Sequence, residues 1–236
     1  MKYIYKRGGE RMAAEGVSSW RELEERVNRL GFLPLFRNEI EGFSAEEYTA
    51  GMPWWSGDPE QDPWFWREVM ARGGRVAYGK FFGRKAGFIS LEWLPYFVNF
   101  RREGYDFDAR WEDGLAPVRQ KKLMDCFAGR DGWMGAELQA AAGFGKGGEK
   151  NFAGVMAELQ MQTYLVIRDF QQKVNKRGAP YGMPVSVYAM PEAVWGYGAV
   201  TAAYAEEPAA SKERIYARAG ALFPRAAERQ LQRVLG

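Results

Sequence analysis

The carboxylates of the segment YDFDARWEDGL are the residues best suited to chemistry. Asp106 and Asp108 stand two positions apart, and an Asp-x-Asp step can hold a magnesium ion or supply a general acid and a general base. Acidic residues in front of a helix can instead cap it and interact with its dipole. We take Asp106 and Asp108 as the candidate catalytic pair, with the capping role left open.

The chain contains no histidine and a single cysteine, Cys126. The missing imidazole excludes Ser-His-Asp and Cys-His hydrolases, histidine-ligated zinc enzymes and zinc deaminases. One cysteine excludes a disulfide framework and a cysteine-based zinc site. Catalysis would therefore use carboxylate, tyrosine, lysine, arginine or amide groups, and we expect neither a metal nor a cofactor.

Basic and amide side chains that could bind phosphate fall into three groups along the chain. The net charge is only +3, so a nucleic-acid site must be a local patch. A single basic loop, taken alone, is more often a solvent-exposed surface loop than a nucleic-acid site. The three groups are Lys80, Arg84 and Lys85; Lys146, Lys150 and Asn151; and Lys173, Lys176 and Arg177.

The elements that would position the last two groups follow the order of a winged helix-turn-helix. A helix within Leu115–Ala128, with the apolar face Leu115, Val118, Leu123 and Phe127, is followed by short helices at 135–143 and 151–162. The third helix of such a trio enters the major groove with its N-terminal residues leading, which here are Lys146, Lys150 and Asn151.

A hairpin is predicted after the third helix. The strand TYLVIRDF leads into the polar loop QQKVNKRGAPYGM, and PVSVYAMP returns. Lys173, Lys176 and Arg177 lie in that loop. A wing of this kind runs along the DNA backbone or the minor groove, where its cations neutralise phosphates.

The N-terminal half combines helices with a second hairpin. Ser18 or Ser19 caps a helix that runs to Gly31, and RVAYGKFFGRKAGFIS forms two strands joined near Gly83, with Lys80, Arg84 and Lys85 at the turn. The segment 50–74 carries Trp54, Trp55, Trp64 and Trp66. Tryptophans at this density fill a core or build a platform on which bases stack, and the core is the commoner role.

The run ELQMQTYLVIRDF with VYAMPEAVWG resembles the second winged helix of the AlkZ/YcaQ type of DNA glycosylase. Val187, Tyr188, Met190, Pro191 and Glu192 match the closing pattern of its returning strand. Upstream, the residues Lys85 to Ser90 and Pro95 resemble the family's segment that leads to "EASLLP". The resemblance covers roughly residues 20 to 195 and implies a DNA-binding fold.

The resemblance also implies where catalytic amides should stand. These enzymes carry a Gln-apolar-Gln or Gln-apolar-Asp motif after the first helix, and the corresponding place here reads Pro34, Leu35, Phe36. The family's catalytic amides are then missing. A Gln-Met-Gln does occur at Gln160 to Gln162, at the end of the third winged-domain helix, where we interpret it as structural.

We expect an α+β chain with a winged helix-turn-helix, in tandem with a second one as an alternative, and additional helices. The predicted parts are a flexible lead over 1–16, a helical and β-hairpin domain over 17–113, the winged-helix domain over 114–191, and C-terminal helices over 192–236.

The predicted function is duplex-DNA binding by a relative of the AlkZ/YcaQ glycosylases without glycosylase activity. An active DNA glycosylase that excises alkylated bases with Asp106 or Asp108, and a winged-helix protein-interaction module, are the alternatives. No apolar run reaches membrane-spanning length and no signal-peptide core is present, so we expect a cytoplasmic protein.

Overall fold

The computed structural model describes residues 3–5, 11–13, 16–175 and 177–236. Within the predicted lead, β1 (Tyr3–Tyr5) and β2 (Arg11–Ala13) pair antiparallel. The rest is a mixed arrangement of helices and small antiparallel sheets, which confirms the α+β prediction. In the described residues no helix combines the length and the apolar character that a membrane crossing needs.

The N-terminal helix α1 (Trp20–Leu30) forms where its capping residues predict it. The Ser19 hydroxyl accepts a hydrogen bond from the Glu22 backbone N–H, and the Ser18 N–H donates to the Glu22 carboxylate. Gly31 ends the helix at φ +99°, where a Cβ atom would lie 2.7 Å from the Trp93 ring. The helix therefore stops at the one residue type that this turn tolerates.

A three-stranded antiparallel sheet in the order β3-β5-β4 forms the centre of the N-terminal half. Helices α1 and α3 lie against it, and α4 follows it with Pro95 in the first turn, where a proline is tolerated. The bounds are β3 Phe32–Pro34, α2 Ala45–Tyr48, α3 Pro63–Gly73, β4 Val76–Phe82, β5 Lys85–Ser90 and α4 Leu94–Arg102.

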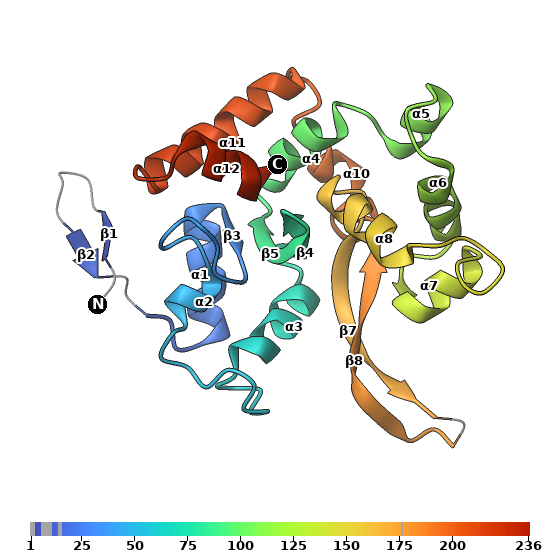
Figure 1. Ribbon diagram of the computed structural model, residues 1–236, viewed down its shortest axis with the longest axis horizontal. Coiled ribbons are helices and arrows are strands. Elements are labelled where there is room, and N and C mark those ends of the chain that lie inside the picture. The colour runs from blue at the N-terminus through green and yellow to red at the C-terminus, as the bar shows by residue number, and fades with distance from the viewer. Residues whose placement is uncertain (1–2, 6–10, 14–15, 176) are drawn as a thin grey trace.

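The C-terminal helices share this first hydrophobic core. Helix α11 packs on α4, and the C-terminal helices lie over the N-terminal half (Figure 1). Leu231, Val234 and Leu235 of α12 are buried in the first core. The chain end thus folds back over its N-terminal half. The bounds are α9 Pro191–Trp195, α10 Tyr197–Val200, α11 Pro208–Leu222 and α12 Glu228–Leu235.

Helices between residues 107 and 161 enclose a second core. The helix predicted from Leu115 begins only at Val118, and both Leu115 and Val118 are exposed, so that part of the predicted apolar face is wrong. Pro117 disfavours the helical conformation at the residue before it, which delays the helix start. The bounds are α5 Phe107–Glu112, α6 Val118–Met124, the 3-10 turn η1 Asp125–Phe127, β6 Trp133–Met134, α7 Gly135–Ala141 and α8 Phe152–Met161.

The hairpin of β7 (Val166–Val174) and β8 (Pro180–Ala189) projects from the body as a long ribbon (Figure 1), and β6 joins it in the order β6-β8-β7. The loop predicted over residues 171–183 is mostly strand. Near its tip the ribbon is exposed on both faces, so its sequence lacks the alternation that marks a half-buried strand.

Candidate nucleic-acid interface

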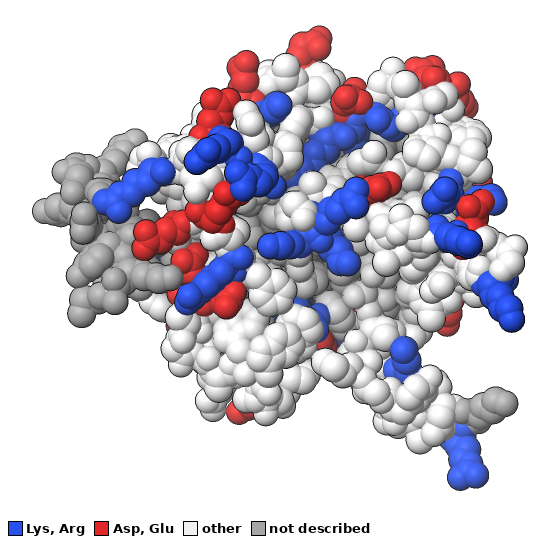
Figure 2. Space-filling model, viewed as in Figure 1, with Lys and Arg blue, Asp and Glu red and all other residues white. Residues whose placement is uncertain are grey.

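A groove of about 700 Å³ lies where the β4–β5 hairpin and α3 face α7, β7 and β8. Figure 2 shows lysine and arginine side chains gathered across the middle of this face, over the β4–β5 region. Residues predicted to bind DNA from two separate parts of the sequence meet here. The basic residues that line the groove are Arg67, Lys80, Arg84, Lys85 and Lys173.

Among the described residues that line the groove, none is acidic. Lys80, Lys85 and Lys173 have no carboxylate partner within the described chain, whereas Arg84 donates to Glu158 at 3.0 Å from an exposed position. Uncompensated cations along one concave surface produce a positive potential there, because the low-dielectric walls focus the field. The groove therefore suits a polyanion.

A two-residue turn places the cations of the β4–β5 hairpin at the groove. Gly83 and Arg84 both adopt positive φ, at +55° and +63°, as a type I′ hairpin turn requires. The end of α8 holds this hairpin: the Lys80 backbone N–H donates to Gln160 Oε1 at 3.1 Å, and the Arg84 N–H to Met161 Sδ at 3.3 Å. The predicted hairpin and its turn are confirmed.

Gln160, the first residue of the literal Gln-Met-Gln run, is buried and structural. Besides accepting from Lys80, it donates from Nε2 to the Met156 carbonyl at 2.9 Å. The Oε1 atom of Gln162 is buried without a hydrogen-bond partner in the described chain. Neither glutamine lines the groove.

The opposite wall of the groove is tied to α3 through Arg72. Its Nε donates to Asp169 Oδ1 at 2.8 Å and its Nη2 to the Phe170 carbonyl at 3.1 Å, so α3 and β7 are joined directly. Together with the contacts of α8 to β4, this fixes the position of Lys173 relative to Lys80 and Lys85.

The floor of the groove contains a buried cation among aromatic rings. The Arg67 guanidinium lies 3.6 Å from the Trp64 ring centroid and 4.3 Å from that of Phe170. Burial lowers the pKa of Arg67, and burial raises the pKa of the neighbouring Tyr78 to about 12. The attraction between the guanidinium and the ring face on each side offsets part of the free-energy cost of removing this charge from water.

The segment after β3 brings an aromatic residue to the groove. Pro34 and Leu35 are buried, and Phe36 lines the groove while its ring packs 6.1 Å from Trp54 and 6.4 Å from Trp64, measured between centroids. Pro34, Leu35 and Phe36 offer no side-chain group that could orient a water molecule or take a proton.

The remaining predicted DNA-binding residues lie outside the groove lining. Lys146, Lys150 and Asn151 are exposed in the glycine-rich turn between α7 and α8, which is held by ion pairs from Lys122 and Arg119 to Glu149. Arg177 is exposed at the β7–β8 tip, and Lys176 lies outside the described residues. A ligand longer than the groove would be needed to reach both sets.

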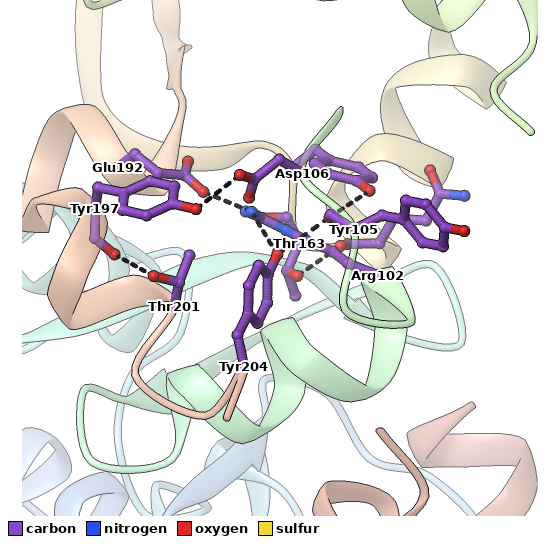
Figure 3. Close-up of polar contacts among 10 residues, drawn as sticks. Arg102, Tyr105, Asp106, Thr163, Glu192, Tyr197, Thr201 and Tyr204 are labelled. Atoms are coloured by element: carbon purple, nitrogen blue, oxygen red, sulfur yellow. Dashed lines mark hydrogen bonds and ion pairs between the residues drawn. The ribbon is translucent and has the colours of Figure 1, made fainter. Parts of the chain in front are cut away.

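Asp106 and Asp108 line a second pocket, of about 580 Å³, at the start of α5. Figure 3 shows the polar network beside it: Tyr197 donates to Asp106 Oδ2 at 2.7 Å, and the buried Arg102 pairs with Glu192 at 2.5 Å. Asp106 precedes α5 but makes no side-chain cap bond. Within the described chain no group of three or more Asp, Glu or Cys side chains could hold a metal ion.

The carboxylate pocket and the basic groove share no lining residue. The structure brings Asp106 and Asp108 together with Glu192, Asp125 and Lys121, but not with the cations of the groove. Sequence reasoning missed Arg67 and Arg102, because a buried arginine has the same letter as an exposed one, and only its tertiary neighbours reveal it.

Residues 17–236 match the protein family described as AlkZ related. No curated protein and no solved structure matches the chain.

Proposed function

Because the chain belongs to the AlkZ-related family, we propose that it binds duplex DNA through the basic groove and the neighbouring β7–β8 hairpin, without glycosylase activity. The observation that carries the proposal is the meeting of Lys80 and Lys85 with Lys173, more than eighty residues away along the chain, in one groove whose described lining residues include no Asp or Glu. Phosphate neutralisation by such cations gives affinity that does not depend on sequence.

We also propose that residues 114–191 act as a winged helix. The order of α6, β6, α7, α8 and the β7–β8 hairpin, with the sheet order β6-β8-β7, supports this assignment. In that arrangement α8 is the recognition helix, and Lys146, Lys150 and Asn151 precede or cap it. These exposed residues then contact the duplex beyond the groove.

The absence of glycosylase activity is proposed from the segment Pro34–Phe36. A glycosylase must place a water and stabilise an oxocarbenium-like sugar. Where the AlkZ/YcaQ enzymes carry amides for this purpose, the chain has two buried apolar residues and an aromatic ring at the groove. Among the described residues, the groove lining also offers no carboxylate that could substitute for these amides.

The activity can be tested with duplex DNA that contains N7-methylguanine. We expect the purified protein to release no base above the spontaneous rate. Robust release would overturn the proposal, and the variants Asp106→Asn and Asp108→Asn would then decide the mechanism: loss of release would assign the reaction to the carboxylate pocket.

A specific observation favours the protein-interaction alternative. Val174, Tyr181 and Met183 are large apolar residues on the β7–β8 ribbon, and each is more than half exposed. Apolar side chains on an exposed strand suit a partner protein, although they can also enter a minor groove. A chain that binds no duplex at low salt would leave this alternative as the better one.

A further inference from the structure

Trp55 is a large aromatic residue held on the surface in an unfavourable backbone conformation. Its side chain is 59% exposed, and its φ of +67° lies in the left-handed region that residues with a Cβ atom avoid. Neither burial nor backbone preference explains a tryptophan at this position. Strain of this kind persists only where the surroundings impose it, and it is concentrated at functional sites.

The surrounding loop is fixed by the buried carboxylate of Asp62. Its Oδ1 accepts hydrogen bonds from the backbone N–H groups of Trp55 at 3.0 Å and Trp64 at 2.9 Å, and its Oδ2 accepts from Gly57 at 3.1 Å. One side chain therefore caps α3 and holds the Trp55 backbone in place. The exposed ring is presented by a rigid loop.

Trp55 ends a series of ring and guanidinium contacts that begins in the groove, and its ring is tilted by 40° to that of Trp64. The centroids of the Trp55 and Trp64 rings are 4.1 Å apart. The Arg67 guanidinium lies 3.6 Å from the Trp64 centroid and 4.3 Å from the Phe170 centroid. Trp64, Arg67 and Phe170 all line the groove. The stack thus leads from the basic groove to an aromatic ring exposed to solvent.

We propose that this stack, Trp55–Trp64–Arg67–Phe170, is a platform for one unpaired base of a DNA strand whose phosphates follow Lys80, Lys85 and Lys173. The proposal rests on the proposed DNA binding and adds a substrate class to it, namely duplex DNA that contains an unpaired base. Every base has a π face, so stacking on tryptophan is tolerant of sequence. The fully buried Trp66 keeps the core role that tryptophans in this segment were expected to have.

Two properties of the site favour a base over an apolar protein segment. The Trp55 ring is exposed, while the Arg67 guanidinium is buried between Trp64 and Phe170 and supports Trp64 from below. Lys80, Lys85 and Lys173 of the groove have no carboxylate partner among the described residues and could follow the phosphates. A rigid, preorganised ring also loses little conformational entropy when a base stacks on it.

The test uses the full chain and three oligonucleotides of one sequence: a paired duplex, the duplex with a single bulged 2-aminopurine, and the single strand. Fluorescence anisotropy gives the affinities, and quenching of 2-aminopurine reports stacking. We expect the bulged duplex to bind about 5- to 150-fold more tightly than the paired one, which is the range that stacking of one base on an aromatic side chain provides. We also expect the 2-aminopurine fluorescence to be quenched on binding.

Trp55→Gly is the decisive variant. Glycine accepts the positive φ without strain, so the loop can keep its shape after the ring is removed. We expect it to lose the quenching and the preference for the bulge but to keep its affinity for paired duplex. Trp55→Phe retains an aromatic ring, so it should keep part of the quenching and part of the preference for the bulged duplex.

Several outcomes would overturn the platform. Equal affinity of the wild-type chain for bulged and paired duplex would do so, and so would a Trp55→Gly variant that keeps the preference and the quenching. Binding of the single strand alone, dependent on Trp55, would support the platform but overturn the duplex function. If the wild-type chain binds none of the three oligonucleotides, both the platform and the proposed duplex binding are overturned.

Discussion

Arg102 Nη1 lies 2.5 Å from Glu192 Oε1 in an ion pair that joins the end of α4 to the start of α9. The guanidinium is almost completely buried, and its Nη2 donates to the Thr163 carbonyl at 2.8 Å, beyond the end of α8. This one side chain therefore joins α4 of the first core to Thr163, which directly precedes Tyr164 of the second core.

Glu192→Gln should destabilise the fold strongly, because the Arg102 charge would stay buried without its carboxylate. We expect a loss of about 3 kcal/mol in the free energy of unfolding, measured by urea denaturation. The control is Glu137→Gln, which breaks a pair of similar length between Arg130 and Glu137 that is about half exposed; it should cost less than about 1 kcal/mol. Equal losses in the two variants would contradict the bridging role of Arg102.

Asp62→Ala should also destabilise the fold, because three backbone N–H groups lose their acceptor at once. We expect a loss of about 2–3 kcal/mol from the missing helix cap and the unpaired amides. Asp58→Ala provides a matched control in the same loop, since Asp58 is exposed and its carboxylate accepts one hydrogen bond, from the Glu60 N–H, within the described residues. If the environment of the Trp55 ring is unchanged in Asp62→Ala, the conformation of this loop does not depend on Asp62.

Gly31→Ala should be poorly tolerated at the end of α1. The added Cβ meets the Trp93 ring at 2.7 Å in a backbone conformation of φ +99°, and we expect a loss of about 1–3 kcal/mol. Gly73→Ala, at the end of α3 with open space around it, should be neutral or stabilise by up to about 1 kcal/mol. Thermal unfolding of the two variants side by side measures the difference.

Alkaline pH should destabilise the protein through Tyr78. Burial raises the pKa of its hydroxyl from 10.0 to about 12, so the folded state keeps the proton after the unfolded state has lost it. The contribution is fully present below about pH 10 and is lost as the pH rises through 12, by about 3 kcal/mol in total. Urea unfolding across this range should show a shallower decline for Tyr78→Phe, and an unchanged decline would contradict the assignment.

Local signals in the sequence predicted the helices, strands and turns but not the tertiary contacts between them. The Ser19, Glu22 and Gly31 pattern locates α1, and the alternation around Gly83 locates the β4–β5 hairpin, because caps and turns depend on neighbouring residues. The extension of β7 to Val174 was missed, since a ribbon exposed on both faces has no polar alternation.

The candidate site was predictable only as separate groups of cations. That Lys80 and Lys85 share a groove with Lys173 follows from long-range contacts, such as Gln160 on the β4 backbone and Arg72 on Asp169, which no local spacing encodes. The Trp55–Trp64 stack was equally out of reach, because the sequence does not distinguish an exposed tryptophan from a core one.

The salt dependence of duplex affinity tests DNA binding in the groove most directly. The variant Lys80→Ala/Lys85→Ala/Lys173→Ala is compared with Arg21→Ala/Lys212→Ala/Arg229→Ala, which removes the same charge from exposed positions outside the groove lining. We predict that only the first variant weakens binding at low salt, and that it reduces the slope of log affinity against log salt by about 2–3. Equal effects of the two variants, or no effect of the first, would contradict DNA binding in the groove.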